Sequence, residues 1–399
     1  MSAPPLSAPQ LPPGVPVVGM VGAGQLARMT QQAAIALGVH LRVLAVGAAD
    51  CAAGVCSDVR LGGPRDLAAV QDFARGVDVL TFDHEHVPAA LVADLERGGV
   101  VARPGSHALP YVQDKLQMRQ RLAASGFPVP QWAVPRPGHE LEDLRAFAAD
   151  HHWPVVVKAV SGGYDGRGVW VVEDETAAAR LVDALADLRW FVETHVAFRR
   201  EVAVQVARSA TGEIRAWPLV QTVQENGICT LVIAPAPQTD PEHAAHARTL
   251  AENIAKELDV VGLLAVEMFD TGGDEPFVVN ELAMRPHNSG HWTMDGSVTS
   301  QFEQHLRAVL GWPLGDTSLR APVTVMANLL GGSGPHAAAV HSRIPAALAD
   351  PGVRLHLYNK QVKPGRKIGH VNVCDAEVDA AVQRAGMAVR ILRGEDGSR

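Results

Sequence analysis

The chain has 399 residues, 47% of them hydrophobic, and 35 Lys+Arg against 43 Asp+Glu give a net charge of −8. This length predicts two or three domains with enough apolar material for several cores. The mildly acidic balance, without a block of like charges, argues against nucleic acid or a membrane surface as the main partner.

Cysteine usage and the N-terminus point to a cytoplasmic protein. No apolar run reaches the roughly 18 residues that a membrane span needs. The proline-rich start, Met1–Pro16, lacks the basic and apolar regions of a signal peptide. The cysteines form no CxxC pair and are too few to cross-link the chain, so we expect them to be reduced. They are Cys51, Cys56, Cys229 and Cys374.

The first part of the chain reads as an α/β unit with an open parallel sheet. After residues 1–14, which we expect to be disordered, a strand at Val15–Val21 precedes a helix at Met29–Leu37 that Gly38 ends. Further strands are predicted at Leu41–Val46, Val77–Phe82 and Gly98–Pro104. A helix at Asp114–Ala124, followed by the breaker Ser125–Pro130, places the first domain at residues 1–124.

The second domain is predicted at residues 125–315, with a lid at about 125–192 and a second half at about 193–315. Its strands are expected at Val155–Val160, Gly168–Val172, Trp190–Glu193, Glu201–Ala207, Arg215–Val220, Leu263–Asp270 and Pro276–Leu282. Its helices are expected at Thr176–Leu188, Glu242–Leu258 and Ser300–Leu310. We expect the strands Glu201–Ala207 and Arg215–Val220 to pair, and residues 316–399 to form a small strand-rich domain.

Two glycine-rich loops are candidate ligand sites. Gly22–Ala27 matches G-x-G-x-x-G/A at a strand-to-helix turn, but no acidic residue ends the next strand, so a dinucleotide, another small ligand and simple tight packing all remain open. Lys158 precedes a loop with glycines at 162, 163, 166 and 168 that also carries Tyr164, Asp165 and Arg167. Such a loop joins strand to strand, which predicts a flexible flap over phosphate groups.

Three further groups of polar residues suggest a site for charged substrates. Glu267 and Glu281 are expected to oppose each other across a hairpin, where two like charges favour a cation such as Mg²⁺, although two exposed glutamates on a solvated edge remain the alternative. Arg285–Thr293 gathers an arginine and two histidines, which is typical of an oxyanion or substrate pocket. Leu357–Val371 holds four cations within eight residues, which predicts a phosphate clamp, although solvated surface charge remains the alternative.

Taken together, Lys158, the Gly163–Gly168 loop and the Glu267/Glu281 hairpin resemble the ATP-grasp superfamily. The strings Gly163–Gly168, His287–Thr293 and Pro364–Lys367 resemble the family within it that carboxylates aminoimidazole ribonucleotide in purine synthesis. The resemblance runs from about Val15 to past His370. It implies an ATP-grasp fold with a Rossmann-like pre-grasp domain before it and a small strand-rich domain after it.

The resemblance also implies roles for individual residues. ATP contacts are implied for Lys115, Lys158, Gly163, Tyr164, Asp165, Gly166, Arg167, Gly168, Val169, Glu193, Thr194, His195, Val196, Glu201, Gln224, Asn280 and Glu281. Catalytic roles are implied for Arg285, Lys158, Tyr164, Asp165, Arg167, His287 and Asn288. Binding of aminoimidazole ribonucleotide and bicarbonate is implied for Gln25, Glu85, His86, Tyr164, Arg285, His287, Asn288, Lys360, Arg366 and Lys367. Glu267 and Glu281 are implied to hold Mg²⁺, for which Mn²⁺ could substitute.

Some positions depart from the family pattern. Asp83 stands where the family shows glutamate, Gln224 replaces a histidine and Met284 replaces a proline. The resemblance further implies a homodimer, no NAD, no biotin, and transfer of the product to a carboxyaminoimidazole ribonucleotide mutase. The alternatives are another ATP-grasp carboxylase or a purine transformylase, an NAD-dependent oxidoreductase built on the Gly22 loop, and, most remotely, a non-catalytic binding module.

Overall fold

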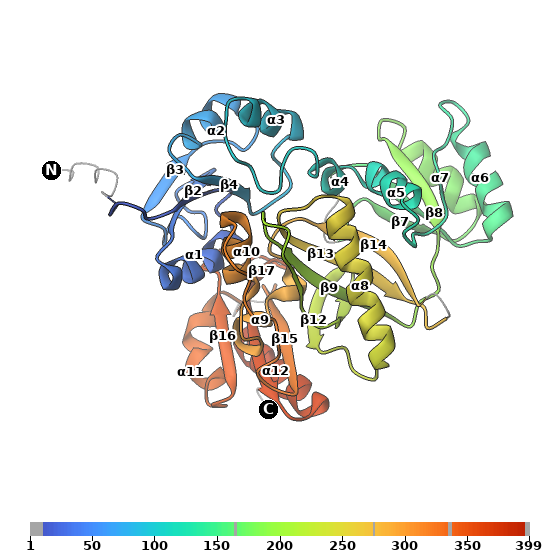
Figure 1. The fold of residues 1–399 in the computed structure, drawn as a ribbon. Helices are drawn as coiled ribbons and strands as arrows, with labels where there is room; N and C mark the ends of the chain where they lie inside the picture. Colours follow the sequence, from blue (N-terminus) through green and yellow to red (C-terminus); the bar gives the residue numbers. More distant parts are fainter. Residues whose placement is uncertain (1–10, 163–165, 274–275, 334–336, 396–399) are drawn as a thin grey trace.

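Three β-sheets organise the computed structural model, which describes residues 11–162, 166–273, 276–333 and 337–395 (Figure 1). The first sheet is parallel, in the order β3-β2-β1-β4. Its strands are β1 (Val17–Val21), β2 (His40–Ala45), β3 (Asp58–Leu61) and β4 (Val79–Phe82). All four residues of β4 are buried, as a parallel strand covered on both faces requires.

The prediction of a strand at Gly98–Pro104 is wrong. This segment makes one isolated parallel bridge, between Leu80 and Ala102. The Leu80 N–H donates to the Val101 carbonyl, and the Arg103 N–H donates to the Leu80 carbonyl, each at 2.8 Å. Pro104 then follows without an N–H, so the segment cannot extend the ladder there.

Five helices accompany the first sheet and lead into the next one. They are α1 (Gln25–Leu37), α2 (Leu67–Phe73), α3 (Ala89–Arg97), α4 (Pro110–Gln113) and α5 (Lys115–Ala124). Helix α1 ends at Gly38, in the left-handed conformation, as predicted, but it begins four residues before Met29. Asp114 caps α5 by accepting the Gln117 N–H at 2.8 Å, which places Lys115 in the first turn of that helix.

The second sheet is antiparallel, in the order β5-β8-β6-β7. Its strands are β5 (Trp132–Ala133), β6 (Val155–Ala159), β7 (Val169–Val172) and β8 (Trp190–Thr194). The helices α6 (Glu140–His151) and α7 (Glu175–Ala184) pack together beside it (Figure 1). All five residues of β6 are buried, so Lys158 projects from an interior strand rather than from an exposed edge.

The third sheet has nine strands and continues from the second half of the predicted central domain into the C-terminal part. Its order is β14-β13-β9-β11-β12-β15-β17-β16, and β10 also pairs with β9. The strands are β9 (Arg200–Arg208), β10 (Ile214–Ala216), β11 (Val220–Glu225), β12 (Ile228–Ala234), β13 (Gly262–Asp270), β14 (Phe277–Ala283), β15 (Val323–Leu330), β16 (Val353–Leu357) and β17 (Lys367–Asp375). Pairing of β12 with β15 joins the two parts into one sheet.

The single strand predicted at Arg215–Val220 is in fact two strands. Both β10 and β11 pair with β9, and the regular pairing is interrupted at residues 217–219, although the Trp217 N–H still donates to the Gln205 carbonyl of β9 at 3.0 Å. There Trp217 is fully buried and its indole N–H donates to Ser297 Oγ at 3.1 Å, while Pro218 lacks a ladder donor. The interruption thus coincides with a buried indole and a proline.

The remaining helices cover the third sheet or follow its strands. They are α8 (Pro241–Glu257), α9 (Thr293–Gly296), α10 (Gln301–Leu310), α11 (Ile344–Ala347) and α12 (Val378–Arg393). The 16-residue α12 packs on β15 and β17. This helix was not predicted, because residues 316–399 were expected to be strand-rich. The cysteines are free, as predicted.

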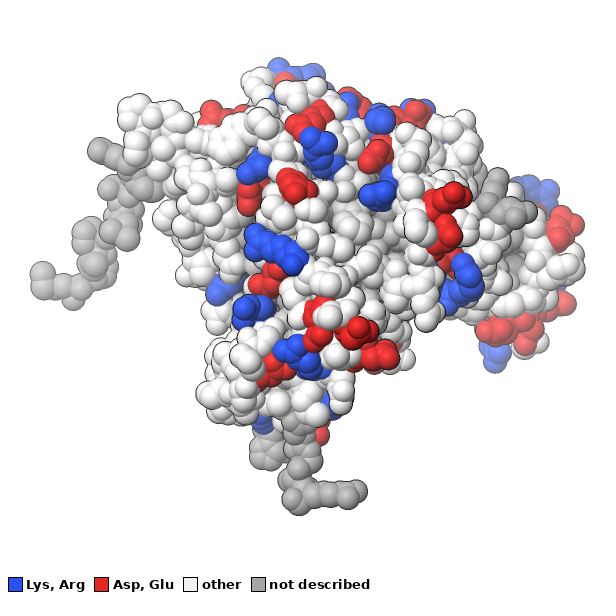
Figure 2. Space-filling model, turned by 60° about the horizontal axis from the view of Figure 1, so that its bottom comes forward, with Lys and Arg blue, Asp and Glu red and all other residues white. Residues whose placement is uncertain are grey.

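On the face shown in Figure 2, acidic and basic side chains are interspersed rather than gathered into one large patch of a single sign. Within the described ranges, no helix is both long and apolar enough to cross a bilayer.

Candidate active site

A cavity of about 1540 Å³ is lined by residues from all three sheets. Most residues singled out from the sequence line it. They are Gln25, Glu85, His86, Lys115, Lys158, Gly166, Val169, Glu193, Thr194, His195, Val196, Glu201, Gln224, Glu267, Asn280, Glu281, Arg285, His287, Asn288, Lys360, Arg366 and Lys367. Arg167 and Gly168 are not part of the lining, and Gly163, Tyr164 and Asp165 lie outside the described residues.

Lys158 is held at one end of this cavity by a buried ionic network. Its Nζ pairs with Glu193 and donates to Asn280 Oδ1 at 2.9 Å. Glu193 also accepts from Arg119 Nε at 2.9 Å. Burial alone would raise the pKa of Glu193, but Lys158 and Arg119 outweigh it and hold that pKa below its usual value. These contacts hold the Lys158 Nζ in place at the cavity wall.

Arg119 is the residue of this network that we did not single out. Its side chain is fully buried, and its two terminal nitrogens donate to the carbonyls of Val279 and Asn280, each at 2.9 Å. It thereby ties α5 to β8 and β14. A signal existed in the sequence, because Arg119 falls on the apolar face of its helix beside Met118 and Leu122, where an arginine needs buried partners.

The two predicted metal carboxylates oppose each other as the spacing indicated. Glu267 on β13 pairs in register with Glu281 on β14. Burial, followed by the charges of Glu281 and Glu201, raises the pKa of Glu267 to about 8. Glu281 Oε1 lies 2.6 Å from Lys115 Nζ, and this lysine keeps the pKa of Glu281 below its usual value although burial opposes it.

Among the described residues, no group of three or more His, Cys, Asp or Glu is arranged to hold a metal ion. Mg²⁺, however, commonly takes one or two protein carboxylates and completes its shell with water and substrate phosphates. The two carboxyl groups of Glu267 and Glu281, which face each other across the hairpin, fit that donor set.

The middle of the cavity holds the predicted bicarbonate residues. Arg285 Nε lies 2.6 Å from Glu85 Oε1, which joins the segment after β14 to the segment after β4. His287 Nε2 lies 3.5 Å from Glu267 Oε1, and burial, followed by the charge of Arg285, holds the pKa of His287 well below its usual value. Nδ2 of Asn288 is buried without a hydrogen-bond partner among the described residues, so a donor is available to an incoming oxygen.

The far end of the cavity brings the first and last parts of the chain together. Lys360 Nζ bonds Gln25 Oε1, and the exposed Arg366 lines the same end. Asp83 accepts the Gly24 N–H at 2.7 Å. The same carboxylate leaves no room for a side chain at Gly22, because an added Cβ would lie 1.7 Å from it. Gly22 also has φ +109°, which favours glycine. The Gly22 loop thus packs tightly against this carboxylate beside the cavity.

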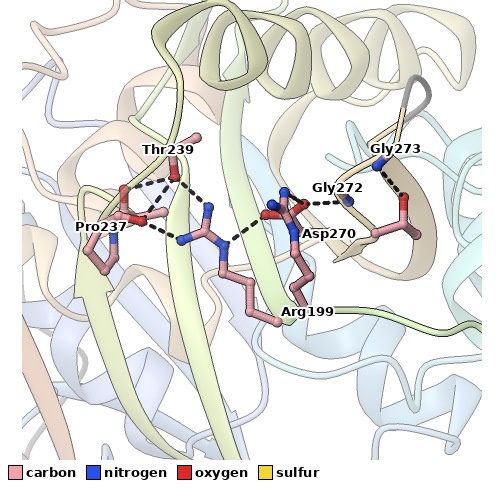
Figure 3. A network of polar contacts seen from close by, with 9 residues as sticks. Arg199, Pro237, Thr239, Asp270, Gly272 and Gly273 are labelled. Atoms are coloured by element: carbon pink, nitrogen blue, oxygen red, sulfur yellow. Dashed lines mark hydrogen bonds and ion pairs between the residues drawn. The ribbon is translucent and has the colours of Figure 1, made fainter.

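The segment between β8 and β9, which carries His195 and Val196 of the predicted ATP contacts, is anchored from outside the cavity. Arg199 Nη2 and Arg200 Nε donate to the two oxygens of Asp270, at 2.9 and 2.8 Å. Arg200 also donates to Thr239 Oγ1 at 2.7 Å, and Figure 3 shows this chain of contacts from Thr239 to Gly272. The end of β13 therefore fixes the point where the segment rejoins the third sheet.

Comparisons with known proteins match nearly the whole chain. The ATP-grasp domain family model matches residues 120–302, the ribonucleotide synthetase preATP-grasp domain 15–113, and the phosphoribosylaminoimidazole carboxylase C-terminal domain 324–384. The N5-carboxyaminoimidazole ribonucleotide synthase of Mycobacterium tuberculosis is 53% identical over 380 residues, which cover 94% of this chain and 88% of that protein.

Two solved structures share the fold. N5-carboxyaminoimidazole ribonucleotide synthetase from Thermus thermophilus has a TM-score of 0.83 and 35% identity, covering 94% of this chain and 98% of that one. The Aspergillus clavatus N5-carboxyaminoimidazole synthase, solved with ADP and 5-aminoimidazole ribonucleotide, has a TM-score of 0.86 and 29% identity, covering 95% and 98%.

Fold, cavity and relatives define an ATP-grasp ligase with a preATP-grasp domain in front and a carboxylase C-terminal domain behind. Identity at this level over nearly the whole chain assigns the family as well. The chain belongs to the N5-carboxyaminoimidazole ribonucleotide synthases, ATP-dependent ligases of purine biosynthesis.

Proposed function

We propose that ATP binds along Glu193–Val196, that aminoimidazole ribonucleotide binds at the Lys360–Lys367 end, and that bicarbonate lies between them. One observation carries this proposal: a single cavity is lined both by Lys158, Glu267 and Glu281 and by Lys360 and Arg366. The complex of the Aspergillus clavatus relative with ADP and 5-aminoimidazole ribonucleotide supports the same pair of ligands.

Lys115 and Lys158 are proposed to neutralise the transferred phosphoryl group from two sides. Both line the cavity, and each is paired with a carboxylate that keeps its ammonium in place. Glu267 and Glu281 would hold Mg²⁺, which would supply charge neutralisation of the nucleotide phosphates. Glu201, whose pKa is raised by burial and which accepts a hydrogen bond from Gln224, is proposed to contact the nucleotide ribose.

The proposed chemistry proceeds through carboxyphosphate. A bicarbonate oxygen attacks the γ-phosphorus of ATP, the bond from that phosphorus to the bridging oxygen breaks, and ADP leaves. The exocyclic amine of aminoimidazole ribonucleotide then attacks the carboxyphosphate carbon, or CO₂ released from it. The C–O bond to phosphate breaks and the amine loses a proton. Arg285 and Asn288 would hold the carboxylate oxygens during both steps.

Because carboxyphosphate hydrolyses readily in water, the proposal requires the loop after Lys158 to close. The described end of this loop supports close approach to the third sheet. Gly166 has φ +75°, and a Cβ there would lie 3.1 Å from Gly227 Cα, in the turn between β11 and β12. Tyr164, Asp165 and Arg167 are proposed to act from this loop.

The test is an assay of ADP formation with ¹⁸O-labelled bicarbonate, with and without aminoimidazole ribonucleotide. We expect ADP to form rapidly only with all substrates present, and one label to reach inorganic phosphate. Equal ADP formation without bicarbonate would overturn the proposed arrangement, and unlabelled phosphate would overturn carboxyphosphate.

A cytoplasmic homodimer and transfer of the product to a mutase complete the proposal. The product is a carbamate, which loses CO₂ easily, so an enzyme that moves the carboxyl group to carbon must follow promptly.

Light scattering on the purified chain tests the dimer: a mass of one chain at micromolar concentration contradicts it.

A further inference from the structure

Gln301, the first residue of α10, is a buried glutamine whose side-chain amide is fully used. Its Oε1 accepts the His287 N–H at 2.8 Å, and its Nε2 donates to the His287 carbonyl at 2.9 Å. The same Nε2 lies 2.8 Å from Nδ1 of His291. One amide group thus bonds the main chain of His287 and the ring of His291.

These contacts determine the tautomer of His291. A main-chain N–H can only donate and a carbonyl can only accept, so the His287 main chain decides which end of the Gln301 amide is nitrogen. Both hydrogens of that nitrogen are then used, and Nδ1 of His291 must accept one of them. A neutral imidazole with Nδ1 as acceptor carries its proton on Nε2.

The surroundings of His291 favour an uncharged ring. Burial, followed by the charges of Lys367, His356, Arg285 and Lys360, holds the pKa of His291 well below its usual value. His291 is 1% exposed, yet it belongs to the same cavity lining as Arg285 and Lys360. An uncharged N–H donor is therefore fixed among several cations.

We infer that His291 contacts aminoimidazole ribonucleotide, donating a hydrogen bond from Nε2 to one of its oxygens, and that Gln301 is a positioning residue that selects this tautomer. The inference rests on the proposed function for the location of that substrate. A neutral donor suits such a site because it binds an oxygen without adding repulsion to the cations already present.

Two substitutions test the contact. A glutamine amide can reach the position of Nε2, whereas the shorter asparagine reaches that of Nδ1. We expect His291→Asn to raise the KM for aminoimidazole ribonucleotide on the order of 10-fold, with the KM for ATP unchanged, and His291→Gln to recover most of the loss. His341→Asn, at an exposed position, is the control and should match the wild type. Equal KM values for wild type and His291→Asn would overturn the inference.

Nitrogen NMR of ¹⁵N-histidine-labelled wild-type protein tests the tautomer without depending on a variant's activity. The signals of His291, assigned by their loss in either His291 variant, should show the Nε2–H pattern and should shift on titration with aminoimidazole ribonucleotide. Gln301→Met should abolish the fixed tautomer. An Nδ1–H pattern, or no shift at saturation, contradicts the inference.

The kinetic outcomes also separate this inference from the proposed function. If Arg366→Ala raises the KM for aminoimidazole ribonucleotide and His291→Asn does not, the substrate site stands and the His291 contact is wrong. If neither substitution changes that KM, the substrate binds elsewhere and both proposals fail.

Discussion

The two ends of the cavity are built in opposite ways. At the nucleotide end, Lys158 and Arg119 are buried and share the carboxylate of Glu193. At the far end, Arg366 is exposed and its Nη1 donates to the Gln361 carbonyl at 3.4 Å, while Lys360 contacts the neutral amide of Gln25. Buried charges at one end are thus matched by carboxylates, whereas Lys360 and Arg366 at the other contact uncharged groups.

This difference indicates where each end obtains its binding energy. A buried, paired lysine is held in place in advance, and therefore costs little reorganisation when phosphates bind. A cation that contacts only a neutral side chain or the main chain contributes more to the binding free energy of an incoming anion, because the new charge-assisted hydrogen bond contributes about 1.5–3 kcal/mol. We expect substitutions at the first end to affect turnover or folding, and those at the second to affect the affinity for one substrate.

The largest effect is expected for Glu281→Gln, which removes one charge with little change of shape. Turnover should fall by orders of magnitude, because metal stabilisation of the phosphoryl transition state contributes several kcal/mol. Steady-state kinetics at saturating ATP and Mg²⁺ measures this, with the exposed Glu225→Gln as control. Turnover near that of the wild type would show that Glu281 does not hold the metal.

Arg119→Met should chiefly destabilise the fold. It leaves Glu193 with one cation and two buried carbonyls without their donor, and breaking a buried pair costs about 3–5 kcal/mol. Urea denaturation of the free protein measures this loss. The control is Arg121→Met on the same helix, since the side chain of Arg121 is 42% exposed and a surface pair contributes about 1 kcal/mol or less. Equal losses for both variants would contradict the buried network.

Arg366→Ala should act on one substrate. We expect the KM for aminoimidazole ribonucleotide to rise by about 10- to 100-fold and the KM for ATP to stay the same. Arg366→Lys should recover part of the loss if the contact is bidentate. Lys363→Ala is the matched control, because Lys363 is exposed on the same segment and is not part of the cavity lining. Weaker ATP binding in Arg366→Ala would show that Arg366 acts on the nucleotide and would contradict its proposed contact with aminoimidazole ribonucleotide.

The smallest effect concerns pH. The pKa of Glu267 is about 8 in the folded protein against an ordinary value of 4.5, so the folded state holds an extra proton between these values and its stability falls as pH rises through them. A cation at Glu267 must displace this proton, so the affinity for Mg·ATP should rise toward pH 8 by at most about 10-fold per pH unit. Calorimetry in buffers of different ionisation enthalpy detects the released proton, and Glu267→Gln should release none.

Local patterns were enough to predict several elements and pairings. The opposition of Glu267 and Glu281 followed from hairpin register, because side chains across a short turn pair by count. Helix α10 begins after its cap, Ser300, and α1 ends at Gly38, since both signals act within a few residues. The family resemblance rested on short strings, and most of the site residues that it implied line the cavity.

Tertiary structure alone decided how these residues act together. Nothing near Arg119 in the chain identifies Glu193 as its partner, and nothing near Gln301 indicates that it sets the tautomer of His291. The irregular stretch between β10 and β11 likewise contains Trp217, whose indole N–H finds its acceptor, Ser297 Oγ, 80 residues away in the chain. Local propensities determine where an element begins and ends, whereas the partner of a buried charge or amide depends on which distant segments fold against it.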